Sequence, residues 1–505
     1  TKDTSETVNV VIDEDNIYRR LSQLTSYSGS EYGVIFDGKS EHVYFIKSDG
    51  KNRNLMKIKW DGSDAKEVMS AKGLRRLQRS PDGKYLHFTK RGKLQRLPNG
   101  KKKAENLPFQ ARMRIDYQAE QEQIFDEAYR LIRARFYDPD FHGRDLEKLK
   151  SIYRPLALQA STRQDFRDMF NAMLGQLNSS HMGLYGGSRE DVQRRRTAQL
   201  GVDLLATEKG WRVQRVIPNS PAERPESRLE EGDRIIQIDG EAWTTEANAY
   251  RQLEEKVQDR IWLKVENADG DTRDVYLRTA SSMRSLLYKE WVADRRALTE
   301  KYSQGRLGYI HIQGMNRPSF EVFERELMAA GYGKEGIVID VRYNGGGWTT
   351  DLLMAVLDVR QHAYTIPRNA AKSLDEHKKF RDYYPFSERL PLSAWTKPSA
   401  ALCNSNSYSN AEIFSHAYKQ LDIGPLVGEP TFGAVISTGG ARLIDGSFIR
   451  LPFRGWFVKA TDQNMDMHPA VPDHIVSHPP GFKATGEDLQ LKKAVDVLLA
   501  DIEAE

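Results

Sequence analysis

Buried strands alternate with amphipathic helices over roughly the last 220 residues, and this alternation limits the fold more than any other feature. Residues 307–312 are predicted to form a strand, and the continuous apolar run at 336–341 predicts a strand that is buried on both faces. Between them, residues 320–330 have the apolar spacing of a helix. Strand, helix and buried strand in that order form the repeating unit of a parallel sheet. Residues 283–505 are therefore predicted to form an α/β domain.

A glycine-rich turn follows the second of these strands. It reads Asp-Val-Arg-Tyr-Asn-Gly-Gly-Gly over 340–347, and a helix is predicted to begin near residue 352. A phosphate-binding loop also joins a strand to a helix, but neither Gly-Lys-Ser/Thr nor a spaced Gly-x-Gly-x-x-Gly occurs here. Glycine lets backbone N–H groups approach a ligand closely. Gly346 and Gly347 are therefore candidates for an oxyanion hole, a set of N–H donors that stabilises a developing negative charge.

A second turn between a strand and a helix holds a cluster of serines. The strand predicted at 399–403 runs into Asn-Ser-Asn-Ser-Tyr-Ser-Asn over 404–410, and the apolar face of a helix follows. A serine in this position has an exposed hydroxyl near the positive end of the helix dipole, which favours a nucleophile. Taken alone, the same residues are also typical of an ordinary turn that caps a helix. Other parts of the chain must decide between the two interpretations.

The composition is that of a globular protein with several domains. The chain has 505 residues, 39% of them apolar and 29% charged, so we expect three or four domains. A net charge of +4 argues against a dedicated nucleic-acid binder, and no apolar run is long enough to cross a membrane. Cys403 is the only cysteine, which excludes an intrachain disulfide, and the histidines lack the spacing of metal ligands, so no metal or cofactor is expected. The chain begins at Thr1, which indicates a processed form or a fragment.

Residues 1–112 are predicted to form strands with an internal repeat. Asp37 and Asp82 each begin an Asp-Gly turn before an aromatic, apolar strand, and the two turns lie 45 residues apart. This spacing is the period of a four-stranded propeller blade. Two blades cannot close a propeller, so they belong to a larger propeller or pack in another way. Two unrelated hairpins are the simpler alternative.

Residues 113–197 are predicted to form a helical bundle. One amphipathic helix extends from Tyr117 to the stop at Asp138-Pro139, and a second begins after Thr162 as its N-cap. The second helix ends at Asn-Ser-Ser-His-Met-Gly over 178–183, so His181 lies in a loop rather than on the packed face. A loop histidine is usually only solvated, but a serine nucleophile needs a base whose pKa lies near neutrality.

Residues 198–282 look like a PDZ domain. Leu-Gly-Val at 200–202, Ser-Pro-Ala at 220–222 and Gly-Asp-Arg-Ile-Ile-Gln-Ile-Asp-Gly at 232–240 occur in the order of that family. The Gly-Asp and Asp-Gly pairs suit tight turns on either side of a strand. A PDZ domain binds extended peptide termini by adding a strand to its sheet.

The order of these parts resembles the tricorn protease family, which is related to the carboxyl-terminal processing peptidases. Ser-x-x-Glu-Ile-Phe at 409–414 and Gly-Glu-Pro-Thr-Phe-Gly at 428–433 add to the resemblance. It covers about 117–500 well and the first 112 residues more loosely. It implies a multidomain α+β fold with β-propeller-like N-terminal strands, a helical bundle, a PDZ domain and an α/β, ClpP/crotonase-like serine protease domain.

The resemblance also implies a nucleophile and a base. In the processing peptidases the nucleophile precedes the motif glutamate by three positions, which selects Ser409 and leaves Ser405 and Ser407 as lesser candidates. Those enzymes use a lysine base, but Ala434 occupies the lysine position here, so a Ser-Lys dyad at this site is excluded. Tricorn-type enzymes instead use a histidine preceded by a serine, which corresponds to His181.

Two further residues are expected to orient that base. The resemblance implies this role for Ser180 and for an acid shortly before a Pro-Asp pair, where the sequence has Asp466 in place of the family's glutamate. Because aspartate reaches about one methylene less far, Asp462 or a water stays open as the alternative. The oxyanion is expected to rest on the backbone N–H of Asn410 and on one of the two glycines named above.

The implied activity is hydrolysis of peptides or unfolded polypeptides by a Ser-His-Ser-Asp/Glu tetrad, in an endo- or carboxypeptidase. Tricorn relatives are hexameric and cytoplasmic, so a homo-oligomer is expected by resemblance, although an exported form also fits the missing start. The alternative is a catalytically inactive protein of the same fold that binds peptides or an apolar ligand. A nucleotide-dependent enzyme has little support. The joint presence of Ser409, Ser180 and His181 favours the peptidase.

Overall fold

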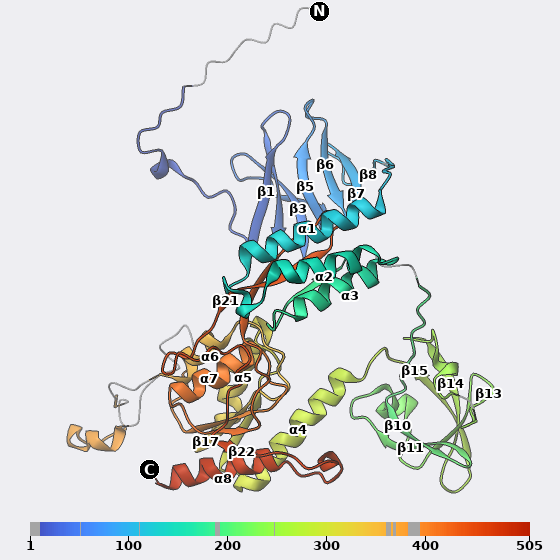
Figure 1. Ribbon diagram of the computed structural model, residues 1–505, viewed down its shortest axis with the longest axis vertical. Helices are drawn as coiled ribbons and strands as arrows, with labels where there is room; N and C mark the ends of the chain where they lie inside the picture. The colour runs from blue at the N-terminus through green and yellow to red at the C-terminus, as the bar shows by residue number, and fades with distance from the viewer. Residues whose placement is uncertain are drawn as a thin grey trace, which may run out of the picture. The chain divides into compact units, whose positions relative to one another are not determined.

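The chain forms two compact units, Thr1–Ile115 and Asp116–Glu505 (Figure 1). The computed structural model describes residues 11–50, 52–110, 112–186, 192–246, 248–359, 365–366, 370–381 and 394–504. Within these ranges, no helix combines the length and the apolar character that a membrane span needs.

The first unit contains two four-stranded antiparallel sheets in which each strand pairs with its neighbours in the chain. One sheet consists of β1 (Ser30–Phe36), β2 (His42–Ser48), β3 (Arg53–Lys59) and β4 (Lys66–Ser70). The other consists of β5 (Leu74–Arg79), β6 (Tyr85–Lys90), β7 (Lys93–Pro98) and β8 (Glu105–Asn106). The repeated turns meet, because a Cβ on Gly38 would lie 2.9 Å from the Cα of Gly83. The antiparallel strands are confirmed, whereas the propeller stays a prediction.

Three helices open the second unit: α1 (Tyr117–Arg135), α2 (Leu146–Leu158) and α3 (Arg163–Gly175). The predicted N-cap is confirmed, since Thr162 Oγ1 accepts the backbone N–H of Asp165 at 3.1 Å. The apolar faces of the helices form one core together with Leu443, Ile449 and Leu451 from the far end of the chain.

A three-stranded sheet explains why residues so distant share that core. β9 (Gly183–Tyr185) follows α3 and pairs with β21 (Phe448–Gly455), which pairs with β20 (Ile436–Arg442). The loop that carries His181 lies just before β9. The sheet therefore brings this loop to the α/β domain.

The PDZ stretch folds into an antiparallel sheet in the order β10-β11-β12-β14-β15, and β13 pairs with β12. Its strands are β10 (Val202–Thr207), β11 (Gly210–Val216), β12 (Arg234–Ile238), β13 (Glu241–Ala242), β14 (Arg260–Glu266) and β15 (Thr272–Arg278). The predicted Gly-Asp and Asp-Gly turns flank β12. Helix α4 (Arg284–Ser303) leads from this domain to the next.

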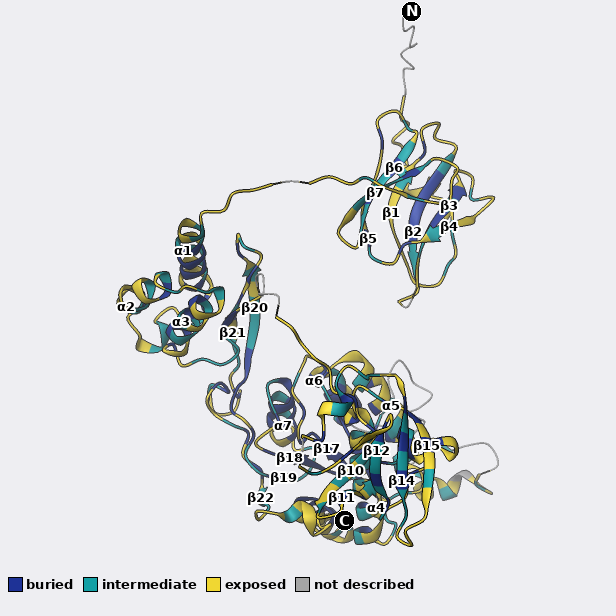
Figure 2. Ribbon diagram, turned by 90° about the vertical axis from the view of Figure 1, so that its right-hand side faces the viewer, coloured by how far each residue is buried: buried dark blue, intermediate teal, exposed yellow. Residues whose placement is uncertain are grey.

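The last part is a parallel sheet in the order β16-β17-β18-β19-β22, as the alternation of strands and helices predicts. Its strands are β16 (Leu307–His311), β17 (Gly336–Asp340), β18 (Ser399–Cys403), β19 (Leu426–Gly428) and β22 (His474–Ile475). Its helices are α5 (Arg317–Gly331), α6 (Thr350–Leu357), α7 (Asn410–Gln420) and α8 (Leu489–Ala504). The strands β17 and β18 are buried along their whole length (Figure 2). Because they are parallel neighbours, the glycine turn after β17 and the serine cluster after β18 meet at one edge of the sheet.

Candidate active site

Ser409 is the N-cap of α7 and has an unusual backbone conformation. Its φ of 58° and ψ of −116° are rarely adopted by residues with a side chain, and such strain costs on the order of 1–3 kcal/mol. A Cβ on Gly346 would lie 2.8 Å from the Cβ of Ser409, so the glycine turn approaches the serine as closely as only glycine allows. The half-buried Ser409 hydroxyl donates no hydrogen bond within the described ranges, so its proton is available to a base.

The two other candidate serines have different surroundings. Ser407 is fully buried, and its hydroxyl donates to the carbonyl oxygen of Val341 at 2.9 Å and accepts the N–H of Asn404 at 3.1 Å. Ser405 is exposed and its hydroxyl lies 3.4 Å from Glu429 Oε2. Ser407 therefore holds the turn together, whereas Ser405 lies at the surface.

Glu412 is fully buried, and its carboxylate accepts four hydrogen bonds. Its Oε1 accepts the backbone N–H of Ser409 at 2.8 Å and that of Ala434 at 2.9 Å. Its Oε2 accepts the Thr431 hydroxyl at 2.8 Å and the N–H of Gly433. Burial raises the pKa of Glu412, and these donors oppose that rise. One carboxylate thus joins the backbone of the candidate nucleophile to the loop at 431–434.

Two backbone N–H groups beside Ser409 have no acceptor in the described ranges and are candidates to bind an oxyanion. The N–H of Gly346 is occupied, since it donates to Asn344 Oδ1 at 2.9 Å. The Oδ1 of the Asn410 side chain is engaged as well, since it accepts the N–H of Thr350 at 3.1 Å. The backbone N–H groups of Asn410 and Gly347 have no acceptor among the residues that the structure describes. Of the two candidate glycines, Gly347 therefore retains an available donor.

His181 contacts Tyr408, the residue before Ser409, rather than the Ser409 hydroxyl. Its Nε2 is 3.1 Å from the carbonyl oxygen of Ala434, and its Nδ1 is 3.3 Å from the Tyr408 hydroxyl. The rings of His181 and Tyr408 are 4.6 Å apart. Because a carbonyl oxygen only accepts, Nε2 carries the hydrogen in the neutral ring and Nδ1 carries the lone pair. The expected contact between His181 and the Ser409 hydroxyl is not formed in this structure.

The surroundings of His181 favour its neutral form. Burial lowers the pKa of His181, and the positive charge of Arg450 lowers it further. The carbonyl of Ala434 and the charge of Asp466 act in the opposite direction. A neutral imidazole is the form that can accept a proton from a hydroxyl.

Asp466 lies next to the loop that carries the histidine, but it does not bond the ring. It is 2% exposed, and its Oδ2 accepts the Ser179 hydroxyl at 3.0 Å and the backbone N–H of Ser180 at 3.3 Å. Its Oδ1 and the Ser180 hydroxyl are both buried without a partner in the described chain. The alternative acid, Asp462, is exposed. Asp466 therefore reaches the base loop, whereas the bond from Ser180 to the imidazole is not formed.

Three residues of this site were not predicted as functional from the sequence: Ser179, Tyr408 and Glu412. Ser179 and Tyr408 immediately precede predicted site residues, and that adjacency was the available signal. Glu412 served only as the motif position that selects Ser409, and no spacing rule shows that its carboxylate accepts hydrogen bonds from the loop at 431–434.

One cluster of possible metal-ligand side chains bears on the prediction that the histidines lack the spacing of metal ligands. Ligand atoms of Asp37, Glu41 and His42 lie within 4.8 Å of one another. Asp37 Oδ2 is 3.0 Å from His42 Nδ1, and Asp37 Oδ1 accepts the N–H of Glu41 at 2.9 Å. These bonds close the turn before β2, which accounts for the grouping.

Comparison with known families agrees with this architecture. The chain matches peptidase family S41 over residues 306–476, the tricorn protease C1 domain over 117–175 and the tricorn protease PDZ domain over 198–282. The α/β domain with its serine at the turn between strand and helix is thus that of a serine-type peptidase family. More narrowly, the chain belongs to the tricorn protease family, which is related to the C-terminal processing peptidases.

Individual relatives give the extent of the similarity. Tricorn protease homolog 1 of Streptomyces coelicolor is 29% identical over 450 residues, which cover 84% of this chain and 40% of that protein. The tricorn protease of Thermoplasma acidophilum is 28% identical over 389 residues, which cover 75% of this chain and 35% of that protein. A crystal structure of the tricorn protease has the same fold, with a TM-score of 0.80, 24% identity and coverage of 94% of this chain and 47% of the other. The chain therefore spans less than half the length of these relatives.

Proposed function

We propose that this chain is the catalytic part of a serine peptidase that hydrolyses peptide bonds in peptides or unfolded polypeptides. The observation that carries the proposal is Ser409, whose hydroxyl and whose neighbouring N–H groups, on Asn410 and Gly347, donate to no described residue. A nucleophile next to two free N–H donors is the arrangement that acyl transfer requires. A homo-oligomer and a cytoplasmic location stay predictions from the resemblance.

In the proposed reaction, Ser409 Oγ attacks the carbonyl carbon of the scissile bond while His181 takes the hydroxyl proton. The tetrahedral oxyanion binds to the N–H groups of Asn410 and Gly347. Loss of one such donor typically lowers kcat by roughly 10²–10³. The C–N bond then breaks, and His181 returns the proton to the leaving amine. Water hydrolyses the resulting ester of Ser409 in a second step with the same proton transfers.

This role requires the imidazole of His181 to turn from the Ala434 carbonyl toward Ser409. Catalytic hydrogen bonds are often long or absent before substrate binds, so its present contacts do not conflict with the role. The Ser180 hydroxyl and Asp466 Oδ1 support the proposal, because both are buried beside the base loop with unused hydrogen-bonding capacity. A turned imidazole would give these groups a partner, which would fix its tautomer.

A second function follows from the same contacts. Both nitrogens of His181 are engaged by Ala434 and Tyr408, which also fits an inactive relative that only binds peptides or an apolar ligand. Hydrolysis separates the two functions, since a binding protein would retain peptide without cleaving it.

The experiment compares cleavage of unfolded polypeptide by the wild-type chain and by Ser409→Ala, with Ser405→Ala as the matched control. We expect Ser409→Ala to abolish cleavage with a nearly unchanged melting temperature, and Ser405→Ala to retain activity. Full activity in Ser409→Ala would overturn the assignment of the nucleophile. Absence of cleavage by the wild type together with retained peptide would favour the binding protein.

A further inference from the structure

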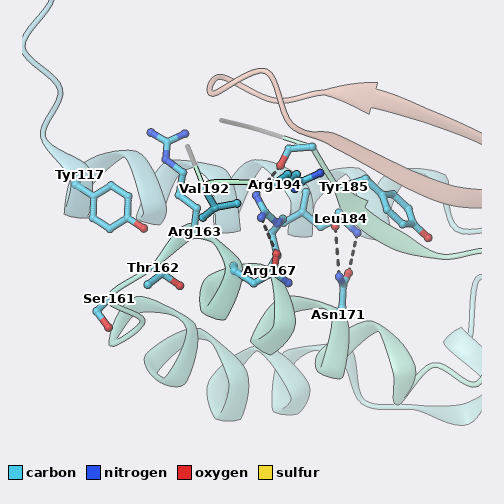
Figure 3. A pocket seen from close by; sticks show the side chains of 12 residues that line it. Tyr117, Ser161, Thr162, Arg163, Arg167, Asn171, Leu184, Tyr185, Val192 and Arg194 are labelled. Atoms are coloured by element: carbon cyan, nitrogen blue, oxygen red, sulfur yellow. Dashed lines mark hydrogen bonds between the residues drawn. The ribbon is translucent and has the colours of Figure 1, made fainter. Parts of the chain in front are cut away.

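A cavity of about 770 Å³ lies away from Ser409, between α3, the first residue of α1 and β9. Figure 3 shows its side chains, among them Arg163, Arg167 and Arg194. No aspartate or glutamate is among the described residues that line it. The cavity falls within the size range of ligand pockets and is larger than a single inorganic ion needs.

Among the described residues, two of the three guanidinium groups have no acidic partner. Arg163 pairs with Glu120 at 2.9 Å and with Asp445 at 3.6 Å. Within the described ranges, Arg167 donates to two neutral acceptors, the carbonyl of Gly186 and the side-chain oxygen of Gln164. The exposed Arg194 has no acidic partner in the part of the chain that the structure describes. The cavity therefore attracts anionic groups through Arg167 and Arg194.

Hydroxyl groups without partners lie at the same place. The Tyr117 hydroxyl is buried and makes no hydrogen bond to a described residue. Ser447 is 1% exposed, its hydroxyl also lacks a partner, and it lines a small adjoining cavity that shares Tyr117, Arg163 and Arg167 with the larger one. Buried polar groups are normally hydrogen-bonded, so these two hydroxyls have unused hydrogen-bonding capacity beside the cavity.

The cavity is joined to the candidate base through β9. Asn171 accepts the N–H of Leu184 at 2.7 Å and donates to its carbonyl at 3.3 Å, as the dashed lines in Figure 3 show. These bonds fix the free edge of the strand. The chain from His181 to Tyr185 spans about 13 Å when extended, so a peptide of a few residues could reach from the cavity to the catalytic groups.

We propose that this cavity binds the carboxylate side chains of an acidic peptide segment, with Arg167 and Arg194 as the charged contacts. Guanidinium groups bind carboxylates with two parallel hydrogen bonds, and the volume accepts several side chains. The inference rests on the proposed function only for the peptide nature of the ligand. It makes the cavity a second binding site, separate from the site of bond cleavage.

The test measures binding of a fluorescent peptide that contains glutamates to Ser409→Ala protein, in which hydrolysis cannot interfere. The matched peptide has glutamine at every glutamate. Arg167→Ala is the test variant, because removal of Arg163 would also leave Glu120 and Asp445 without their partner. Arg133→Ala is the control, since Arg133 is an exposed arginine of α1 outside the cavity.

We expect the glutamate peptide to bind at least about tenfold more tightly than the glutamine peptide at low salt. Added salt should weaken binding of the glutamate peptide. Arg167→Ala should lose about tenfold in affinity and Arg133→Ala less than about twofold. Equal affinity for the two peptides, equal loss in the two variants, or full displacement by millimolar phosphate would overturn the proposal. Binding that survives while the wild-type chain fails to cleave peptides would contradict the peptidase function alone.

Discussion

The Nε2 of His181 lies 3.1 Å from the carbonyl oxygen of Ala434. By resemblance, residue 434 occupies the sequence position of the lysine base of the processing peptidases. The N–H of Ala434 donates to Glu412, which also accepts the N–H of Ser409. One buried carboxylate therefore positions both the proposed nucleophile and the residue that the proposed base contacts. We therefore propose Glu412 as a positioning residue, because the four hydrogen bonds that its carboxylate accepts all come from the chain itself.

Glu412→Gln is expected to lower kcat with little change in KM. The amide keeps one acceptor oxygen but places an NH2 group among four donors, so at least one buried donor loses its partner at a cost of about 1–3 kcal/mol. A displacement of Ser409 by that rearrangement should reduce kcat by roughly ten- to a hundredfold. Steady-state kinetics and a thermal melt check this.

Glu429→Gln is the control for that variant. Glu429 is only half-buried and accepts a long hydrogen bond from Ser405 rather than from the nucleophile. Its activity should be within about twofold of wild type. An equal loss in both variants would show that Glu412 has no special role.

The acid limb of the rate profile should lie below pH 6.5. The base must be neutral to act, and burial together with the charge of Arg450 lowers the pKa of His181 from its ordinary value of 6.5. Activity should therefore persist under mildly acidic conditions and fall as pH drops through the lowered pKa. Arg450→Gln removes the positive charge, so it should raise the pKa and move the limb to higher pH. A limb that does not move in this variant would count against His181 as the base.

Tyr408→Phe should retain activity and raise the pKa of the base. The Tyr408 hydroxyl lies 3.3 Å from Nδ1, where it can donate only to the neutral ring. Its removal frees the lone pair and withdraws a bond that favours the neutral form. We expect an unchanged or higher kcat at pH 8 and an acid limb at higher pH. A loss of a hundredfold or more would instead make Tyr408 part of the catalytic machinery.

Asp466→Asn should reduce activity by about tenfold through the base loop. The carboxylate holds Ser179 and the N–H of Ser180, and an amide accepts such bonds more weakly. Asp462→Asn, at an exposed position, should have no effect. If the two variants lost activity equally, neither acid would be the specific partner of the base loop.

Local patterns in the sequence predicted much of the fold. The apolar runs gave the parallel strands β16 and β17, and Thr162 marked the start of α3, because these features depend on neighbours in the chain. The family resemblance implied that the glycine turn and the serine cluster lie close together, and the structure explains it, since β17 and β18 are parallel neighbours that end at one edge of the sheet.

Other features depend on contacts that no local pattern encodes. His181 and Ala434 are 253 residues apart, and β9 brings them together by pairing with β21. The direction of the imidazole is set by a carbonyl and a tyrosine hydroxyl, so its separation from Ser409 could not be predicted. The family resemblance indicated Ser180 and Asp466, but only the structure shows that Ser179 holds the acid.

The central claim is that Ser409 is the nucleophile, and covalent labelling tests it most directly. The wild-type chain is treated with a fluorophosphonate near pH 8, and the modified residue is located by mass spectrometry. We expect one label on Ser409, with a labelling rate that falls on the acid limb of His181 and no label in Ser409→Ala. A label on Ser405 or Ser407, or complete loss of peptide cleavage while Ser409 stays unmodified, would contradict it.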